Sequence, residues 1–173
     1  MGKNAEVTSH SQAFRIIPAH SGDVDDILDI IRDVFESYGM IYDPKNDFPD
    51  LVRYDEHYPP DQTELFVIKK DDCITGCGGV RVDEHDVPYL TRIYISPKHQ
   101  GQKLGETLVR FLIAEAFEKN DRVYLWTDTR FEKAHHLYDK LGFVSDGRKR
   151  PLHDINISYE WYYELDRRNY NLP

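Results

Sequence analysis

The sequence contains only two cysteines, Cys73 and Cys77, among its 173 residues. They stand four residues apart in a predicted strand, so we expect them to share one face at a separation too long for a disulfide. We interpret them as free, packed thiols rather than as metal ligands or a redox pair. The cysteine content therefore argues against disulfide, metal-thiolate and redox functions.

Long apolar runs and an excess of basic residues are also lacking. No stretch reaches the roughly 18 apolar residues that a membrane-spanning helix needs, and residues 1–13 are polar, without an apolar segment of signal-peptide length. We therefore expect a cytoplasmic protein with no membrane partner. The 22 Lys and Arg residues are outnumbered by 31 Asp and Glu residues, for a formal charge of -9. This balance disfavours a nucleic-acid partner and makes a cationic or neutral substrate easier to accommodate.

The length and composition fit a single folded domain. Hydrophobic residues make up 40% and aromatic residues 13% of the chain, which is enough for a buried core. We expect a flexible N-terminal segment at residues 1–12, one domain over residues 13–168 and a short tail at residues 169–173.

Hydrophobic periodicity predicts strands and helices in alternation, without repeats or linkers. The proline-rich segment 40–62 is typical of an ordered loop or a short helix near a binding surface, or of a surface connection packed by its own aromatic residues. The order of elements describes an α+β domain on a mixed sheet. The predicted strands cover residues 14–17, 65–69, 74–82, 89–95 and 123–126, with a last hairpin that starts at Phe143 and ends in residues 155–165. The first predicted helix has apolar residues at helical spacing from residue 24 to residue 35, and the other two cover residues 105–118 and 132–141.

A glycine-containing turn links the strand at 89–95 to the helix that follows it. The turn ends in Gln100-Gly101-Gln102-Lys103-Leu104-Gly105, and the helix opens on the last glycine. Free N–H groups and the positive end of the helix dipole make such a place an anion site that could cradle a pyrophosphate. Glu106 and Thr107 stand where a triphosphate-binding loop needs lysine and a hydroxyl residue, and the dinucleotide glycine spacing is also missing. Taken alone, an ordinary tight turn explains the segment about as well.

A second motif, the run Ala134-x-x-Leu137-Tyr138-x-Lys140-x-Gly142-Phe143, follows at the distance of one more strand and helix, and it changes this balance. With the strand end Ile93-Tyr94-Ile95-x-Pro97 and the loop Gln100-Gly101-Gln102-x-Leu104-Gly105, it makes the chain resemble the GNAT superfamily of N-acetyltransferases. The opening strand and helix at residues 14–39 extend the resemblance over most of the chain.

The resemblance implies a fold, a co-substrate and a reaction. The fold would be a three-layer α/β/α arrangement around a mixed, mostly antiparallel sheet of about seven strands with about four helices. The enzyme would move an acetyl group from acetyl-CoA to a primary amine, without a metal. The backbone of Ile93 and Ile95, on either side of Tyr94, would hydrogen-bond the pantetheine arm. The pyrophosphate would be held by the amides of Gln100, Gly101, Gln102, Lys103, Leu104, Gly105 and Glu106.

The resemblance also implies direct attack in a ternary complex. A primary amine is almost entirely protonated at pH 7, so a base or a water chain must remove a proton. Tyr89 stands where the family often has a glutamate, which leaves Glu84 as a candidate base, with His85 and Asp86 as alternatives. A main-chain N–H of the 93–95 strand would meet the oxyanion. Tyr138 would be the general acid, or else a packed helix residue with a locally satisfied hydroxyl.

Two residues depart from the family pattern, and several alternatives stay open. Lys103 replaces a usual glycine, which is tolerated unless the position needs a positive φ, and Phe131 replaces a frequent asparagine. A non-catalytic acyl-CoA-sensing module and a plain interaction domain are the competing functions. The acceptor could be a small amine, a peptide N-terminus or a lysine side chain. The aromatic face of Tyr159, Trp161 and Tyr163 is interpreted as packing, with an acceptor site or a homodimer seam as alternatives.

Overall fold

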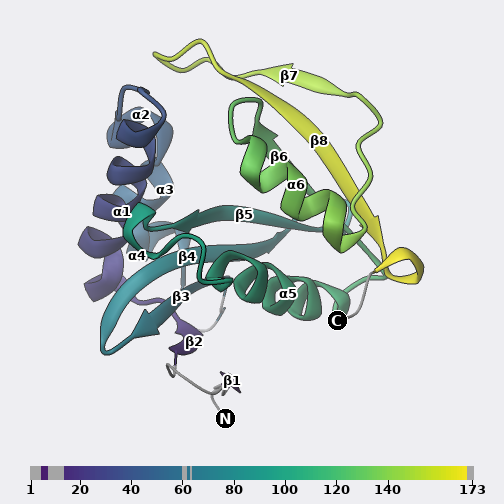
Figure 1. The fold of residues 1–173 in the computed structure, drawn as a ribbon, viewed down its shortest axis with the longest axis horizontal. Helices are drawn as coiled ribbons and strands as arrows, with labels where there is room; N and C mark the ends of the chain where they lie inside the picture. The colour runs from purple at the N-terminus through teal and green to yellow at the C-terminus, as the bar shows by residue number, and fades with distance from the viewer. Residues whose placement is uncertain (1–4, 8–13, 60–61, 63, 171–173) are drawn as a thin grey trace. The chain divides into compact units, whose positions relative to one another are not determined.

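The structure is a computed structural model of the chain, and it describes residues 5–7, 14–59, 62 and 64–170 (Figure 1). Apart from the strand at residues 5–7, the predicted N-terminal segment 1–12 lies outside the described residues, as do residues 171–173 of the predicted tail. The chain groups into two compact units: residues 1–79 with 92–109, and residues 80–91 with 110–173.

Within the described residues, eight strands form a mixed sheet in the order β1-β2-β3-β4-β5-β6-β8-β7. The pair β5–β6 is parallel, whereas β1–β2, β2–β3, β3–β4, β6–β8 and β7–β8 are antiparallel. The predicted mixed, mostly antiparallel sheet is therefore confirmed. The strands are β1 (Ala5–Val7), β2 (Phe14–Pro18), β3 (Leu65–Lys70), β4 (Cys73–Val82), β5 (Pro88–Ile95), β6 (Arg122–Asp128), β7 (Lys149–Pro151) and β8 (Tyr159–Asp166).

In the first unit, helix α1 (Val24–Ser37) presents one apolar face. Its buried residues recur at helical spacing, and Asp25 and Asp26 stand in its first turn, where the positive end of the dipole favours them. The segment predicted as a loop or a short helix forms three helices of four residues each: α2 (Pro44–Asp47), α3 (Pro49–Val52) and α4 (Tyr54–His57). These short helices raise the helix count above the predicted four.

The hairpin of β3 and β4 contains a register shift between Ile68 and Lys69. Cys73 pairs with Lys70 and Cys77 with Val67, and partners three residues apart on β3 lie on opposite faces. Accordingly, Cys73 is exposed and Cys77 is buried. The expectation that the two cysteines share a face was wrong, because a β-bulge reverses the alternation and leaves no trace in the residue pattern.

In the second unit, β6 lies between β5 and β8, and α6 (Glu132–Leu141) has the predicted bounds. Gly142 ends α6 in the left-handed conformation, with φ 97, as a C-terminal glycine is expected to do. The last strand, β8, begins later than predicted. The cause is a turn in which the Asp154 carboxylate accepts a hydrogen bond from Ser158 N (2.8 Å), while Ile157 has φ 51.

Helix α5 (Leu104–Phe117) continues from the first unit into the second. Its side chains are buried on most of its circumference. The fully buried residues are Leu108, Val109, Leu112, Ile113 and Ala116. This burial fixes the helix and, with it, the direction in which its N-terminus points.

Candidate functional site

The turn between β5 and α5 is tied to β4 at its start. Ser96 is buried, and its N–H donates to Thr75 O (2.9 Å). The short 3-10 helix Pro97–His99 then closes with a bond from His99 N to Ser96 O (2.8 Å). Residues 100–103 beyond it are exposed. The structure therefore presents an accessible main-chain turn on a fixed base.

Two residues of this turn have left-handed backbones, Gly101 with φ 78 and Lys103 with φ 60. A Cβ on Gly101 would meet no atom within 4 Å, so glycine is needed there for its positive φ and not because space is short. At Lys103 the same conformation carries the steric cost of a side chain, about 1–2 kcal/mol. The family glycine that Lys103 replaces is therefore replaced at a position that does need a positive φ.

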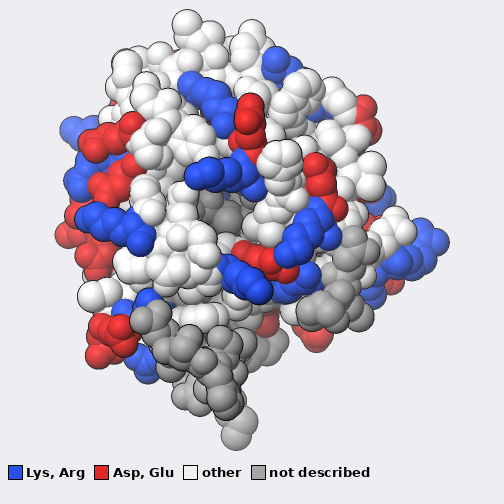
Figure 2. Space-filling view, viewed as in Figure 1, with Lys and Arg blue, Asp and Glu red and all other residues white. Residues whose placement is uncertain are grey.

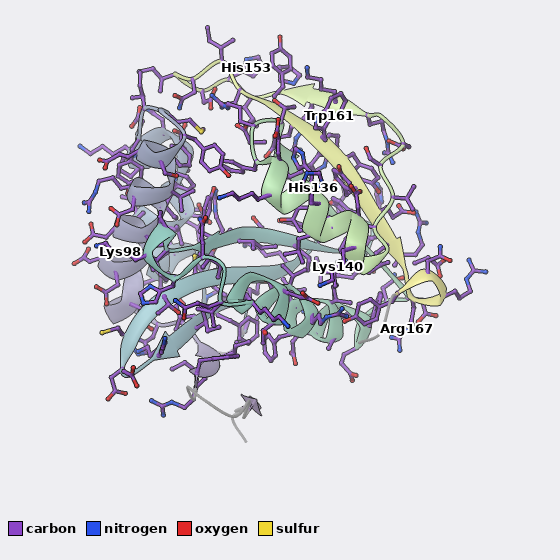
Figure 3. All side chains as sticks on the ribbon, in the orientation of Figure 1. Lys98, His136, Lys140, His153, Trp161 and Arg167 are labelled. Carbon is purple, nitrogen blue, oxygen red and sulfur yellow. The ribbon has the colours of Figure 1, made fainter. Side chains whose placement is uncertain are left out.

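The N-terminus of α5 is open to an anion. The carbonyl of Lys103 accepts from Thr107 N (3.0 Å) and from Thr107 Oγ1 (3.1 Å), so α5 is hydrogen-bonded from this residue onward. The first N–H groups of a helix have no partner inside it and point outward along its axis. Lys98, labelled in Figure 3, and Lys103 are exposed beside the turn, and Lys70 Nζ donates to Gln102 Oε1 (3.1 Å). The N-terminus of α5 and the exposed side chains of Lys98 and Lys103 together fit the negative charge of a diphosphate.

The strand that leads into the turn approaches β4 closely at Gly76. A Cβ on Gly76 would lie 2.7 Å from the Tyr94 carbonyl oxygen and 2.5 Å from Ile95 Cδ1. Only glycine fits there without displacing the main chain of β5. The predicted pantetheine-binding residues Ile93, Tyr94 and Ile95 are half-buried.

Arg92 lies within β5, directly before these residues. Its φ of 55 is left-handed, and its guanidinium forms a fork on Asp50, with Nη2 2.5 Å from Oδ1 and Nε 3.1 Å from Oδ2. The Tyr58 hydroxyl donates to the same Oδ2 (2.6 Å). Burial raises the pKa of Asp50, but the hydrogen bonds and charge of Arg92 and the Tyr58 hydroxyl outweigh it, so the pKa of this carboxyl lies below its usual value.

An aromatic cluster packs beside this ion pair. The Arg92 guanidinium lies 4.8 Å from the Phe48 ring centre, and Phe48 makes edge contacts with Phe35 (5.5 Å) and Tyr94 (6.2 Å). Tyr42 contacts Phe35 at 6.2 Å. The one-turn helices after α1 and the C-terminal end of β5 are thus joined through side chains.

The predicted general acid, Tyr138, lies in the second unit on α6. Its side chain is buried and packs against Phe143 (5.6 Å between ring centres) and Tyr163 (5.9 Å). Burial, together with the neighbouring Tyr163, raises the pKa of Tyr138 well above its usual value. The phenol is therefore protonated at neutral pH, as a proton donor must be, and is a weaker acid than an ordinary tyrosine.

The candidate base Glu84 lies in the turn between β4 and β5. Its side chain is 87% exposed and lies near His85, with 3.7 Å from Glu84 Oε1 to His85 Nε2. Tyr89, which stands at the usual glutamate position, stacks on Tyr124 with ring centres 5.5 Å apart. Tyr124 in turn donates its hydroxyl to Asp83 (3.1 Å) and stacks on Tyr162 at 5.6 Å.

The aromatic residues of β8 divide between its two faces. Tyr163 lies opposite Leu125 and contacts α6, whereas Tyr162 lies opposite Trp126 on the other face. On β7, Arg150 lies over Trp126 (4.3 Å) and Lys149 over Trp161 (5.2 Å); Figure 3 labels Trp161. Lys and Arg side chains stand among Asp and Glu side chains over the face drawn in Figure 2.

The sequence did not point to Asp50 or Arg92. They are 42 residues apart in the chain, and an arginine in a β-branched stretch carries no sign of a left-handed backbone. The His135 side chain lies with Nε2 2.9 Å from Asp128 O. Among the described residues, no group of three or more His, Cys, Asp or Glu side chains is placed to hold a metal ion. Within the ranges that the structure describes, no helix has the length and apolar character to cross a membrane.

The model of the acetyltransferase (GNAT) family matches residues 24–143 of the chain. The chain belongs to the GNAT acetyltransferase family. The predicted family and the general activity of acetyl transfer are therefore confirmed.

Individual relatives agree with this assignment. The chain is 28% identical over 126 residues to spermidine N(1)-acetyltransferase of Vibrio cholerae, which covers 68% of this chain and 71% of the relative. A GNAT-family acetyltransferase of Staphylococcus aureus Mu50 has a similar fold, with a TM-score of 0.74 at 20% identity over 90% of this chain and 99% of that one. The yncA protein of Salmonella typhimurium, solved with its cofactor acetyl-CoA, gives 0.69 at 19% identity over 92% and 97%.

Proposed function

We propose that this protein is an N-acetyltransferase that moves an acetyl group from acetyl-CoA to a primary amine. The observation that carries the proposal is the exposed turn at residues 100–103, whose left-handed residues Gly101 and Lys103 lead the chain into the N-terminus of α5. The acetyl-CoA in the yncA structure of the same fold supports this choice of co-substrate.

The residues of the first unit fit coenzyme A by their chemistry. The amides from Gln100 to Glu106 would bind the pyrophosphate, and Lys98 and Lys103 would add positive charge beside it. The backbone of Ile93 and Ile95 would pair with the amides of the pantetheine arm. Acetyl-CoA supplies an activated acetyl group whose thioester carbonyl accepts a nucleophile.

The reaction would be a direct transfer in a ternary complex. The neutral amine nitrogen bonds to the thioester carbon, a main-chain N–H of residues 93–95 stabilises the oxyanion, and the carbon–sulfur bond then breaks. The departing thiolate takes a proton, which we assign to the Tyr138 hydroxyl. The amine must lose a proton before attack, and Glu84 is the candidate base.

The first test combines binding and turnover. Acetyl-CoA should raise the melting temperature of the protein in a concentration-dependent way. Incubation with acetyl-CoA and a panel of amines should release free thiol, and the panel should include spermidine, because a relative acetylates it. Silence across a broad panel would contradict the proposed activity.

The role of Tyr138 is tested by Tyr138→Phe, which retains the ring packing and removes the hydroxyl. We expect kcat to fall by about 100-fold, as for loss of a general acid, with little change in acetyl-CoA affinity. The matched control is Tyr170→Phe, which removes a hydroxyl that accepts a hydrogen bond from Arg110 (3.2 Å). Equal kcat values for the two variants would remove the acid role. For the base, Glu84→Gln should lower kcat; an unchanged kcat would assign proton removal to solvent.

A sensing module without turnover is the second candidate function. The observation that favours it is the stacked Tyr89, which occupies the usual place of the base. This function predicts thermal stabilisation by acetyl-CoA with no thiol release for any amine, and no change in acetylation on Tyr138→Phe.

A further inference from the structure

The left-handed conformation of Arg92 needs a cause. Among the described residues, Arg92 is the only residue within a strand that has a positive φ without being glycine; the others stand in turns or in the loop before α5. Side chains other than glycine avoid this conformation because Cβ crowds the adjacent carbonyl oxygen. Such a backbone persists only where the surrounding structure holds it.

Both ends of Arg92 are held. The guanidinium is fixed by two hydrogen bonds to Asp50, at 2.5 and 3.1 Å, and the Tyr58 hydroxyl in turn orients this carboxylate at 2.6 Å. The carbonyl oxygen of Arg92 accepts a bond from Cys77 Sγ (3.2 Å) on β4. Planar fork geometry makes such an arginine–carboxylate pair directional as well as strong.

The ion pair of Asp50 and Arg92 is shielded from solvent, so its directional hydrogen bonds can constrain Arg92. The Asp50 side chain is 12% exposed and that of Arg92 is 23% exposed. Phe48 covers one face of the guanidinium. Because Arg92 keeps the pKa of Asp50 below its usual value, the carboxyl is ionised at neutral pH and already paired. Asp50 is therefore unsuited to take a proton from an amine, and its contribution must come through Arg92.

We propose that Asp50 is a positioning residue, whose ion pair with Arg92 holds the left-handed backbone of Arg92 in β5 and thereby aims the main-chain N–H groups of Ile93 and Ile95 at the reacting carbonyl. This inference rests on the proposed function, in which a main-chain N–H of residues 93–95 meets the oxyanion. A left-handed residue in a strand rotates the next peptide out of the regular ladder, as in a β-bulge. A displacement of about 1 Å in such a donor is enough to lower a rate by about 100-fold.

Three variants test the proposal. Asp50→Ala releases Arg92 and should lower kcat by about 10- to 100-fold, with the dissociation constant of acetyl-CoA changed less than about threefold, because the 100–106 turn is retained. The double variant Asp50→Ala/Arg92→Gly should recover kcat to within about fivefold of the wild type, since glycine adopts the positive φ without a clamp. The double variant Asp50→Ala/Arg92→Ala removes the same unpaired charge but retains Cβ, and should stay as slow as Asp50→Ala.

The comparison of the two double variants separates positioning from simple stabilisation. If the Asp50–Arg92 ion pair only attached α3 to β5, the glycine and alanine double variants would be equally active, and that result overturns the proposal. A kcat of Asp50→Ala within twofold of the wild type overturns it as well. The control is Asp72→Ala, which breaks the exposed ion pair with Arg15 (3.1 Å) in the same unit and should leave kcat unchanged.

Amide hydrogen exchange provides a readout that does not depend on activity. Asp50→Ala should speed exchange of the amides of residues 92–95, and Arg92→Gly, but not Arg92→Ala, should slow it again. A wild-type protein that acetylates no amine would defeat the proposed function, while this exchange pattern would still show whether Asp50 holds the left-handed backbone of Arg92. If Asp50→Ala fails to fold, the same series is made with Asp50→Asn, which retains the side-chain volume.

Discussion

Substitution of Gly76 by alanine should loosen the contact between β4 and the end of β5. The added methyl group would lie 2.5 Å from Ile95 Cδ1, 2.7 Å from the Tyr94 carbonyl oxygen and 3.0 Å from Ile68 Cγ2. Ordinary van der Waals contact begins at about 3.5 Å. The Ile95 side chain could rotate away, but the carbonyl oxygen of Tyr94 belongs to the main chain and can only move with the strand.

The size of the effect follows from this geometry. Extra methyl groups forced into packed sites cost about 1–3 kcal/mol, and a backbone neighbour favours the upper part of that range. For a chain of this length, each kcal/mol lowers the melting temperature by about 2–4 °C. We therefore expect Gly76→Ala to reduce the free energy of unfolding by about 2–3 kcal/mol. Acetyl-CoA affinity should fall as well, because the displaced main chain is the proposed partner of the pantetheine arm.

Urea denaturation with a constant m-value measures the loss directly. The control is Gly22→Ala, whose added methyl group would meet only the side chain of His20, at 3.3 Å from Nδ1. That side chain can yield, so we expect a change below about 0.5 kcal/mol. If the two alanine variants were equally stable, the close approach of β4 and β5 would not be what requires glycine at position 76.

Three further predictions concern other parts of the chain. Lys103→Gly should be more stable than Lys103→Ala by about 1 kcal/mol in urea denaturation, because only glycine adopts the positive φ without a steric cost; equal stabilities would contradict the strain. Asp128→Ala should lose about 2–4 kcal/mol in the same assay, since it leaves Arg130 without its carboxylate (2.6 Å) in a partly buried site. A loss as small as that of an exposed ion pair would refute this. Burial and other contacts raise the pKa of Tyr124 and of Tyr162 to about 12. The free energy of unfolding should therefore be constant up to about pH 10 and fall as the pH rises toward 12, because only the unfolded phenols ionise in this range. A plateau that extends through this range would be inconsistent with the raised pKa values.

Much of the fold could be predicted because local chemistry decides it. Helix α6 has its predicted bounds because its apolar positions follow helical spacing and Gly142 supplies the left-handed C-terminus. The turn before α5 could be located from its glycines and from the helix that follows. In each case the decisive residues are neighbours in the chain.

Features that depend on distant partners could not be predicted. The bulge in β4 depends on its pairing with β3, and it places Cys73 and Cys77 on opposite faces against expectation. The left-handed Arg92 has its hydrogen-bond partners far away in the sequence: Asp50 binds its guanidinium, and Cys77 on the neighbouring strand binds its carbonyl oxygen. The late start of β8 depends on a carboxylate hydrogen bond from Asp154 that hydrophobic alternation does not reveal.

Because Cys73 is exposed and Cys77 is buried, the labelling of Cys77 reports on local opening of the protein around β4. Burial raises the pKa of the Cys77 thiol to about 12, although Arg92 and a backbone hydrogen bond lower it somewhat. Reaction with a thiol reagent needs both access and the thiolate. In the folded chain a maleimide should therefore modify Cys73 alone. The rate at which a second label appears on each molecule would then measure how often β4 separates from β5, without any introduced probe.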